Sequence, residues 1–189
     1  MRRAALSLLT GTLLLGCASA QVETGRSYAG DQALPRPDVV LVYDFSLSSS
    51  IISLDSAPGV EPGRAQQAEA YSEEQLKLGR NVASTLAKQL VENLRALGLP
   101  AERAYAPPLS GRHTLMVTGE FVEIDSGTKD TSVRTRTRVY QVAATGPRLL
   151  EEFETAASGS KKPRTAEQIS QRIGTLASRQ GWISQSTGN

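Results

Sequence analysis

The feature that most restricts the fold is a long amphipathic segment in the middle of the chain, residues 72–98. It opens with Ser72-Glu-Glu-Gln75, a capping-box pattern whose two glutamates suit the positive end of a helix dipole. Apolar residues then recur at steps of three and four: Leu78, Val82, Leu86, Leu90, Leu94 and Leu97. Gly98 and Pro100 end the pattern. A helix with a single apolar stripe must cover another apolar surface, so the segment predicts a helix packed on a sheet.

Five other stretches have the composition of β-strands. Residues 39–45, with the sequence VVLVYDF, form an unbroken β-branched and aromatic run typical of a strand covered on both faces. Residues 113–125 and 132–144 lie on either side of a glycine-containing turn, which predicts a hairpin. Shorter runs at 102–105 and 148–157 complete the set.

A second helix is predicted near the C-terminus. Thr165-Ala-Glu-Gln168 repeats the capping-box pattern, and Ile169, Ile173 and Leu176 form an apolar stripe after it. We expect Trp182 to pack back onto the body. The order of elements predicts an α+β fold, with a mixed, mainly antiparallel sheet of about five strands and two helices on one face.

A stripe of arginines alternates with smaller residues along the second hairpin strand: Arg134, Arg136 and Arg138. A register shift of one residue would turn them toward the core, where each unpaired ion costs several kcal/mol. The favoured register therefore puts them with Glu120 on the solvent side and puts three apolar residues under the long helix: Val117, Phe121 and Val139. The guanidinium groups then lie about 7 Å apart. They could contact phosphates, an acidic partner strand, or cross-strand glutamates such as Glu120 and Glu123.

The N-terminus resembles the signal sequence of a bacterial lipoprotein. Arg2 and Arg3 precede an apolar run at residues 4–15, which as a helix would reach about 18 Å, well short of the roughly 30 Å hydrocarbon core. Leu-Leu-Gly16-Cys17 follows and matches a lipobox, and Cys17 is the only cysteine. The resemblance implies cleavage between Gly16 and Cys17 and acyl chains on Cys17 that hold the protein to a bilayer. An ordinary secretory signal, cut after one of the next alanines, is the alternative.

These observations divide the chain into four parts. Residues 1–16 are the predicted signal peptide, 17–37 a lipidated cysteine and flexible tether, 38–183 one α+β domain, and 184–189 a disordered tail. Within the domain, residues 46–71 carry serines and two Pro-Gly pairs and are expected to form a poorly ordered connection. Because alanine, not aspartate, follows the cysteine, the lipoprotein resemblance implies the periplasm-facing side of the outer membrane.

Composition excludes several functional classes. The 21 basic and 19 acidic residues become equal in number once the signal's two arginines are removed, which argues against a nucleic-acid binder. One cysteine and one histidine leave few transition-metal sites, so neither a metal nor another cofactor is expected.

Candidate catalytic groups are few. The sequence has no phosphate-binding glycine loop and no nucleophile elbow. Asp44, Asp55 and Asp125 could meet in space for acid–base work or calcium binding, although strand-end aspartates more often make turns. His113 opens a strand and is expected at the surface. The sequence therefore predicts that the protein is not an enzyme.

Four motifs stand out along the chain: VVLVYDF at residues 39–45, the helix with Leu78-Gly-Arg80, the segment VTGEFVEIDSG at 117–127, and FETAASG at 153–159. As a set they resemble bacterial lipoproteins that carry domain of unknown function 4410. After residue 127 this chain has Thr128-Lys-Asp-Thr-Ser-Val-Arg-Thr-Arg in place of a glycine-rich, arginine-containing segment. The resemblance implies an envelope lipoprotein of uncharacterised activity and brings no catalytic residues.

Three functional hypotheses follow. The first is a lipid-anchored interaction or accessory module that binds an envelope protein through a sheet edge or through residues 46–71. The second is a carrier of anionic lipid or glycan that uses the arginine stripe. The third is an envelope hydrolase built around Asp44, which would require His113 beside it.

Overall fold

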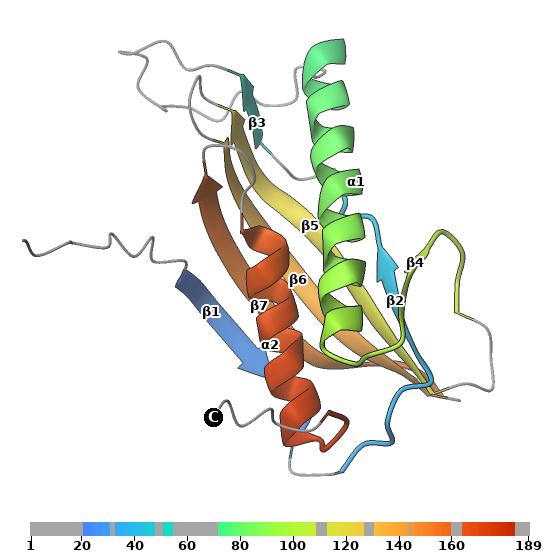
Figure 1. Ribbon diagram of the computed structural model, residues 1–189. Coiled ribbons are helices and arrows are strands. Elements are labelled where there is room, and N and C mark those ends of the chain that lie inside the picture. Colours follow the sequence, from blue (N-terminus) through green and yellow to red (C-terminus); the bar gives the residue numbers. More distant parts are fainter. Residues whose placement is uncertain are drawn as a thin grey trace, which may run out of the picture.

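The long central helix forms as the sequence predicts. The computed structural model describes residues 21–30, 33–47, 51–54, 72–108, 113–126, 131–143, 145–159 and 164–183. In it α1 runs over Glu73–Ala96 (Figure 1), and both bonds of the capping box are present: Gln75 N–H donates to Ser72 Oγ at 3.2 Å, and Ser72 N–H donates to Gln75 Oε1 at 2.8 Å. Gly98 follows with a φ of 82°, a left-handed conformation that suits glycine at a helix end.

Seven described strands form one mixed sheet, in the order β1-β7-β6-β5-β2-β4, with β3 also paired to β5 (Figure 1). Their bounds are β1 Gln21–Ser27, β2 Val39–Tyr43, β3 Ile51–Leu54, β4 Ala101–Ala104, β5 Thr114–Ser126, β6 Thr131–Ala143 and β7 Gly146–Gly159. β2 runs parallel to β4 and β5, whereas in the series β5, β6, β7, β1 each strand is antiparallel to the next. Both helices cover the same face (Figure 1), so the predicted α+β class is confirmed, with two more strands than expected.

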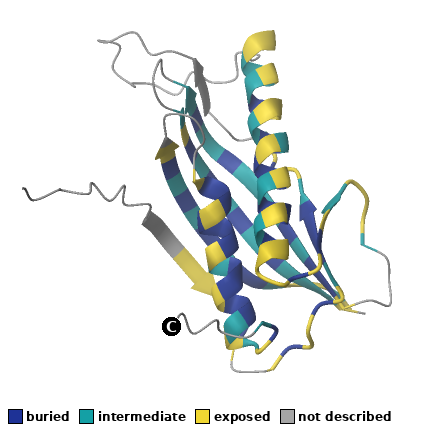
Figure 2. Ribbon diagram, in the orientation of Figure 1, coloured by how far each residue is buried: buried dark blue, intermediate teal, exposed yellow. Residues whose placement is uncertain are grey.

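The favoured hairpin register is confirmed. Glu120 lies opposite Arg136, and Val117 lies opposite Val139. Val117, Phe121 and Val139 are completely buried and belong to the core between sheet and helices. Figure 2 shows this buried layer, with exposed residues on the outer side of both helices. Each fully buried large apolar side chain there contributes about 1.5–3 kcal/mol to folding.

The predicted flexible tether at residues 17–37 is wrong for the part that the structure describes. Gln21–Ser27 forms β1 and pairs with β7, and Tyr28 N–H donates to Leu150 O at 2.7 Å. Further on, Trp182 packs back as expected, and its Nε1–H donates to Leu34 O at 3.0 Å. The polar sequence of β1 hid this strand, because an edge strand can be held by backbone hydrogen bonds with its side chains in water. The domain therefore begins near residue 21 and not at 38.

The connection after β2 is also partly ordered. Ser46 N–H donates to Gly119 O, Phe121 N–H donates to Ser46 O, and β3 then pairs with the end of β5. β2, Ser46 and β3 thus form one interrupted strand alongside β5. The expectation of a poorly ordered connection is wrong for this part; residues 48–50 and 55–71 lie outside the described residues.

The second helix, α2, spans Thr165–Arg179, but its predicted capping box is wrong. Its N-cap is Arg164, without a side-chain cap. Thr165 is buried, and Gln168 Nε2 donates to Ala156 O of β7 instead of closing the helix end. Packing against the sheet therefore takes precedence over capping. No described helix has the length and apolarity needed to cross a membrane.

Candidate functional site

The sheet face opposite the helices carries a row of paired charges, which we call the Arg–Glu ladder. Its members come from the three central antiparallel strands: Glu120 and Glu123 of β5, Arg134, Arg136 and Arg138 of β6, and Glu152 and Glu154 of β7. Side chains alternate across a strand, so these residues face away from the helices whenever their neighbours face the core. The predicted arginine stripe therefore exists, and it lies between two rows of glutamates.

Two of the arginines are held by ion pairs on both sides. Arg136 Nη2 lies 2.7 Å from Glu154 Oε1, and its Nη1 lies 3.1 Å from Glu120 Oε1. Arg138 Nε lies 2.6 Å from Glu152 Oε1, and its Nη2 lies 3.4 Å from the same Glu120 oxygen. Glu120 thus bridges the two guanidinium groups. The sequence indicated Glu120 as a partner but not Glu152 and Glu154, whose register depends on a bulge between Val139 and Tyr140.

The pairing stabilises the protonated form of these arginines. The pKa of Arg136 is raised above its ordinary value by the hydrogen bond from its guanidinium to Glu154, and then by the charge of that carboxylate. The pKa of Arg138 is raised chiefly by its hydrogen bond to Glu152. Each pair is half exposed and contributes at most about 1 kcal/mol alone, but the shared Glu120 links them in one network. An anion that approached either guanidinium would have to displace a carboxylate.

The third arginine is different. Arg134 lies opposite Glu123 in the β5–β6 register, and it has no ion pair with any of the described residues. At the other end of the ladder the face becomes apolar: Met116 lies opposite Tyr140 and beside Leu41 of β2. The face therefore joins a charged half to an apolar half.

The aspartate and histidine candidates do not converge. Asp44 accepts hydrogen bonds from Arg103 Nε at 2.7 Å and Nη2 at 2.5 Å, at the end of β2. His113 directly precedes β5 and lies beside the start of β2, where its backbone N–H donates to Asp38 Oδ2 at 3.0 Å. An extended strand of five residues spans about 16 Å, so Asp44 and His113 are too far apart to act together. The hydrolase arrangement is not formed by these two residues.

The other carboxylates form no metal site within the described part of the chain. Asp125 lies opposite Ser132, near the end of the hairpin, and Asp55 is not among the described residues. No group of three acidic, histidine or cysteine side chains comes close enough to hold a metal ion among the residues that the structure places.

One charged cluster was missed. Glu151 of β7 is completely buried beneath α2, where its carboxylate meets Arg179 Nη2 and, at 3.3 Å, Arg172 Nε. Glu151 and Phe153 are two residues apart on one strand and therefore share a face. The apolar Phe153, a core residue, was the available signal that this glutamate faces inward. Its two partners lie on α2, and only the tertiary structure brings them together. The cluster fixes α2 to the sheet, and its carboxylate is closed off from solvent beneath the helix.

The predicted lipidation residues lie outside the described part of the chain. Gly16 and Cys17 precede residue 21, where the description begins. Cleavage and acylation at these positions stay predictions.

Comparison with known proteins gives a family and several distant structures. The chain matches a family described as Domain of unknown function (DUF4410) over residues 40–132. A PelC dodecamer from Paraburkholderia phytofirmans is 16% identical with a TM-score of 0.47, and the match covers 86% of this chain and 99% of that chain. A hypothetical protein from Chlamydia trachomatis is 13% identical with a TM-score of 0.40, and the match covers 76% and 96% of the two chains. No curated protein matches the sequence.

Proposed function

The chain carries a domain of the DUF4410 family over residues 40–132, and we propose that it acts as a non-enzymatic, lipid-anchored accessory module of the bacterial envelope. In this proposal acyl chains on Cys17 hold the domain to the periplasmic side of the outer membrane. The uncovered sheet face then binds another envelope protein.

The observation that carries the proposal is the Arg–Glu ladder on a sheet face that no described helix covers. The apolar half of this face supplies Met116 and Tyr140, and the ladder supplies arginines whose positions are fixed by glutamates. Methionine, tyrosine and arginine are the residue types enriched at protein interfaces. Fixed charges of both signs suit a partner with a complementary pattern and raise specificity more than affinity.

The short distance between anchor and domain adds a geometric constraint. Three residues separate Cys17 from the start of β1 at Gln21, and the four Cα–Cα steps between them reach about 14 Å when extended. A domain anchored in this way stays close to the bilayer, and its partner would be a membrane-bound or membrane-proximal protein.

Charge reversal in the ladder tests the partner site. Arg136→Glu would place a third carboxylate between Glu120 and Glu154 and disrupt the pattern that a partner recognises. Proteins crosslinked to the wild-type domain in intact envelopes should be lost from this variant and kept in Arg80→Glu, a matched reversal at an exposed position on α1. Identical crosslinked proteins from both variants would contradict the proposed binding face.

The carrier of anionic lipid or glycan is the alternative that one observation favours. Arg134 is the ladder arginine without an ion pair among the described residues, so it is the one able to bind a phosphate without displacing a carboxylate. Weaker binding of Arg134→Glu than of wild type to vesicles containing phosphatidylglycerol would support the carrier, and unchanged binding would exclude it.

A further inference from the structure

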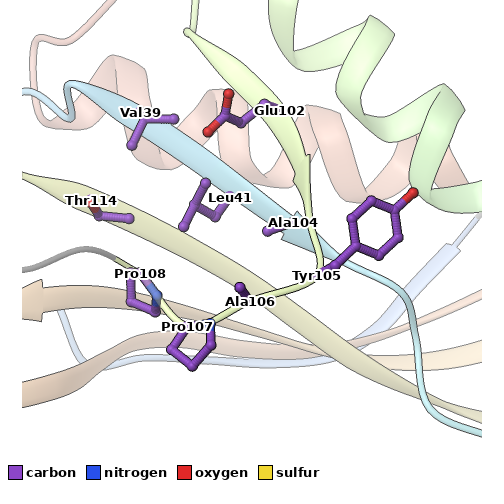
Figure 3. A pocket seen from close by; sticks show the side chains of 9 residues that line it. All are labelled: Val39, Leu41, Glu102, Ala104, Tyr105, Ala106, Pro107, Pro108 and Thr114. Carbon is purple, nitrogen blue, oxygen red and sulfur yellow. The ribbon is translucent and has the colours of Figure 1, made fainter.

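A small apolar pocket lies at the opposite edge of the sheet from β1, on the face away from the helices. Its cavity measures about 220 Å³, and its lining includes Leu41 of β2, Glu102 and Ala104 of β4, and Pro107 and Pro108 (Figure 3). Leu41 is 8% exposed but lies outside the core cluster between sheet and helices. It therefore packs on the face away from the helices, where it lines the cavity.

The segment after β4 forms one wall of this pocket. Tyr43 Oη donates a hydrogen bond to Ala106 O at 2.7 Å, which holds the chain beneath the end of β2. Burial raises the pKa of the Tyr43 phenol. The hydrogen bond from Tyr43 thus holds this wall in place on the sheet, and the cavity is present without a bound partner.

The pocket adjoins a free strand edge. β4 pairs only with β2 among the described strands. Val40 N–H donates to Pro100 O, so in this parallel ladder the backbone groups of Glu102 face β2, while those of Ala101 and Arg103 face outward. Arg95 Nε donates to Ala101 O at 2.7 Å. Ala101 N–H and both backbone groups of Arg103 have no hydrogen-bond partner within the described residues.

The charge beside the pocket indicates what could pair with this edge. Glu102 is exposed and forms no ion pair with any side chain that the structure describes. A second copy of this chain pairing antiparallel through β4 would bring two such glutamates together on one face, and like charges in opposite positions destabilise a sheet. A basic segment avoids this repulsion.

We propose that the β4 edge binds an extended segment of another protein, which inserts an aliphatic side chain into the pocket and places a lysine or arginine against Glu102. Added strands obtain affinity from main-chain hydrogen bonds and specificity from pockets for alternate side chains. Residues two apart on the added strand lie about 7 Å apart on one face, which matches the spacing of Glu102 and Ala104. This site lies on the same sheet face as the Arg–Glu ladder but is formed by other residues, and it does not depend on the lipid anchor.

A displayed library of random heptapeptides, selected on the detergent-solubilised full chain, tests the proposal. We expect enriched peptides that carry an aliphatic residue and a basic residue two positions apart. Glu102→Lys should change the preferred charge from basic to acidic, and Ala104→Leu, which fills the cavity, should weaken the wild-type peptides by about tenfold or more. Glu92→Lys, the same charge change on the exposed side of α1, is the control and should leave the selection unchanged.

Three results would overturn this inference. They are the absence of any enriched peptide, enriched peptides that bind both site variants as well as the wild type, and selection of peptides without a basic residue. A β4-dependent dimer that excludes all peptides would assign the edge to a second copy instead.

Discussion

Gly119 lies on β5 beside the interruption between β2 and β3, and adding one methyl group there should destabilise the domain measurably. A Cβ at this position would stand 2.4 Å from Phe45 Cε2 and 2.6 Å from Cδ2, whereas carbon atoms in contact need about 3.5–4.0 Å. The Phe45 ring is 3% exposed, and its centroid lies 5.9 Å from that of Phe121. The ring therefore has no free space to enter.

The expected cost follows from this overlap. Overpacking of a filled core costs about 1–3 kcal/mol. For a chain of this size each kcal/mol lowers the melting temperature by about 2–4 °C, so Gly119→Ala should lower it by about 4–8 °C at the middle of the range. Thermal unfolding of the Cys17→Ser protein, followed by circular dichroism and by the fluorescence of Trp182, measures this change.

Two controls make the test specific. Gly25→Ala also adds a methyl group to a strand, but its nearest atom is the end of the Arg172 side chain at 3.3 Å, and it should cost less than about 1 kcal/mol. Phe45→Leu should relieve the overlap, so the double variant with Gly119→Ala should lose less stability than the sum of the single variants. An unchanged or higher melting temperature for Gly119→Ala alone would refute the reasoning.

Three further perturbations have defined outcomes. Glu151→Gln removes the buried charge that faces Arg172 and Arg179 and should lower the free energy of unfolding in urea by about 2–4 kcal/mol. This is below the largest values for buried pairs because both arginines reach solvent. A loss under about 0.5 kcal/mol would contradict the structural role of Glu151. Tyr43 should titrate above 10.0, so its contribution to stability is complete below that pH and is lost as pH rises through the higher folded pKa. Tyr43→Phe should remove absorbance change above pH 10.0 from the 295 nm titration, and loss of a component that titrates at or below 10.0 would contradict the burial of this phenol. Arg136→Glu should lower stability by about 1–2 kcal/mol at low salt and by less at high salt, since half-exposed pairs are screened; a salt-independent loss would indicate misfolding instead.

Strong periodicity explains what the sequence could predict. The spacing of apolar residues from Leu78 to Leu97 fits a helix and determines which of its faces is buried. The alternation of arginines with smaller residues leaves one strand register in which no arginine is buried. Capping residues marked the start of α1 because Ser72 is exposed and free to bond to the backbone. The capping-box pattern failed at Thr165, because this residue is buried against the rest of the domain and does not cap the helix.

What could not be predicted depends on contacts between distant parts of the chain. β1 has no apolar alternation because it is an edge strand whose described side chains at 25–27 are exposed. Glu152 and Glu154 become partners of the arginines only through the bulge in the β6–β7 ladder. The β4 pocket is made by a turn that places two prolines against β2, and nothing in the local sequence of Pro107 and Pro108 specifies that position.

Mass spectrometry of the N-terminal peptide from the membrane-purified protein tests the proposed lipid-anchored function most directly. We expect a peptide that begins at Cys17 and carries the mass of a diacylglyceryl group and an amide-linked acyl chain, and we expect this species to be absent from Cys17→Ser. A mature peptide that begins after Ala18 or Ala20, or an unmodified Cys17 thiol in the mature protein, would contradict the account.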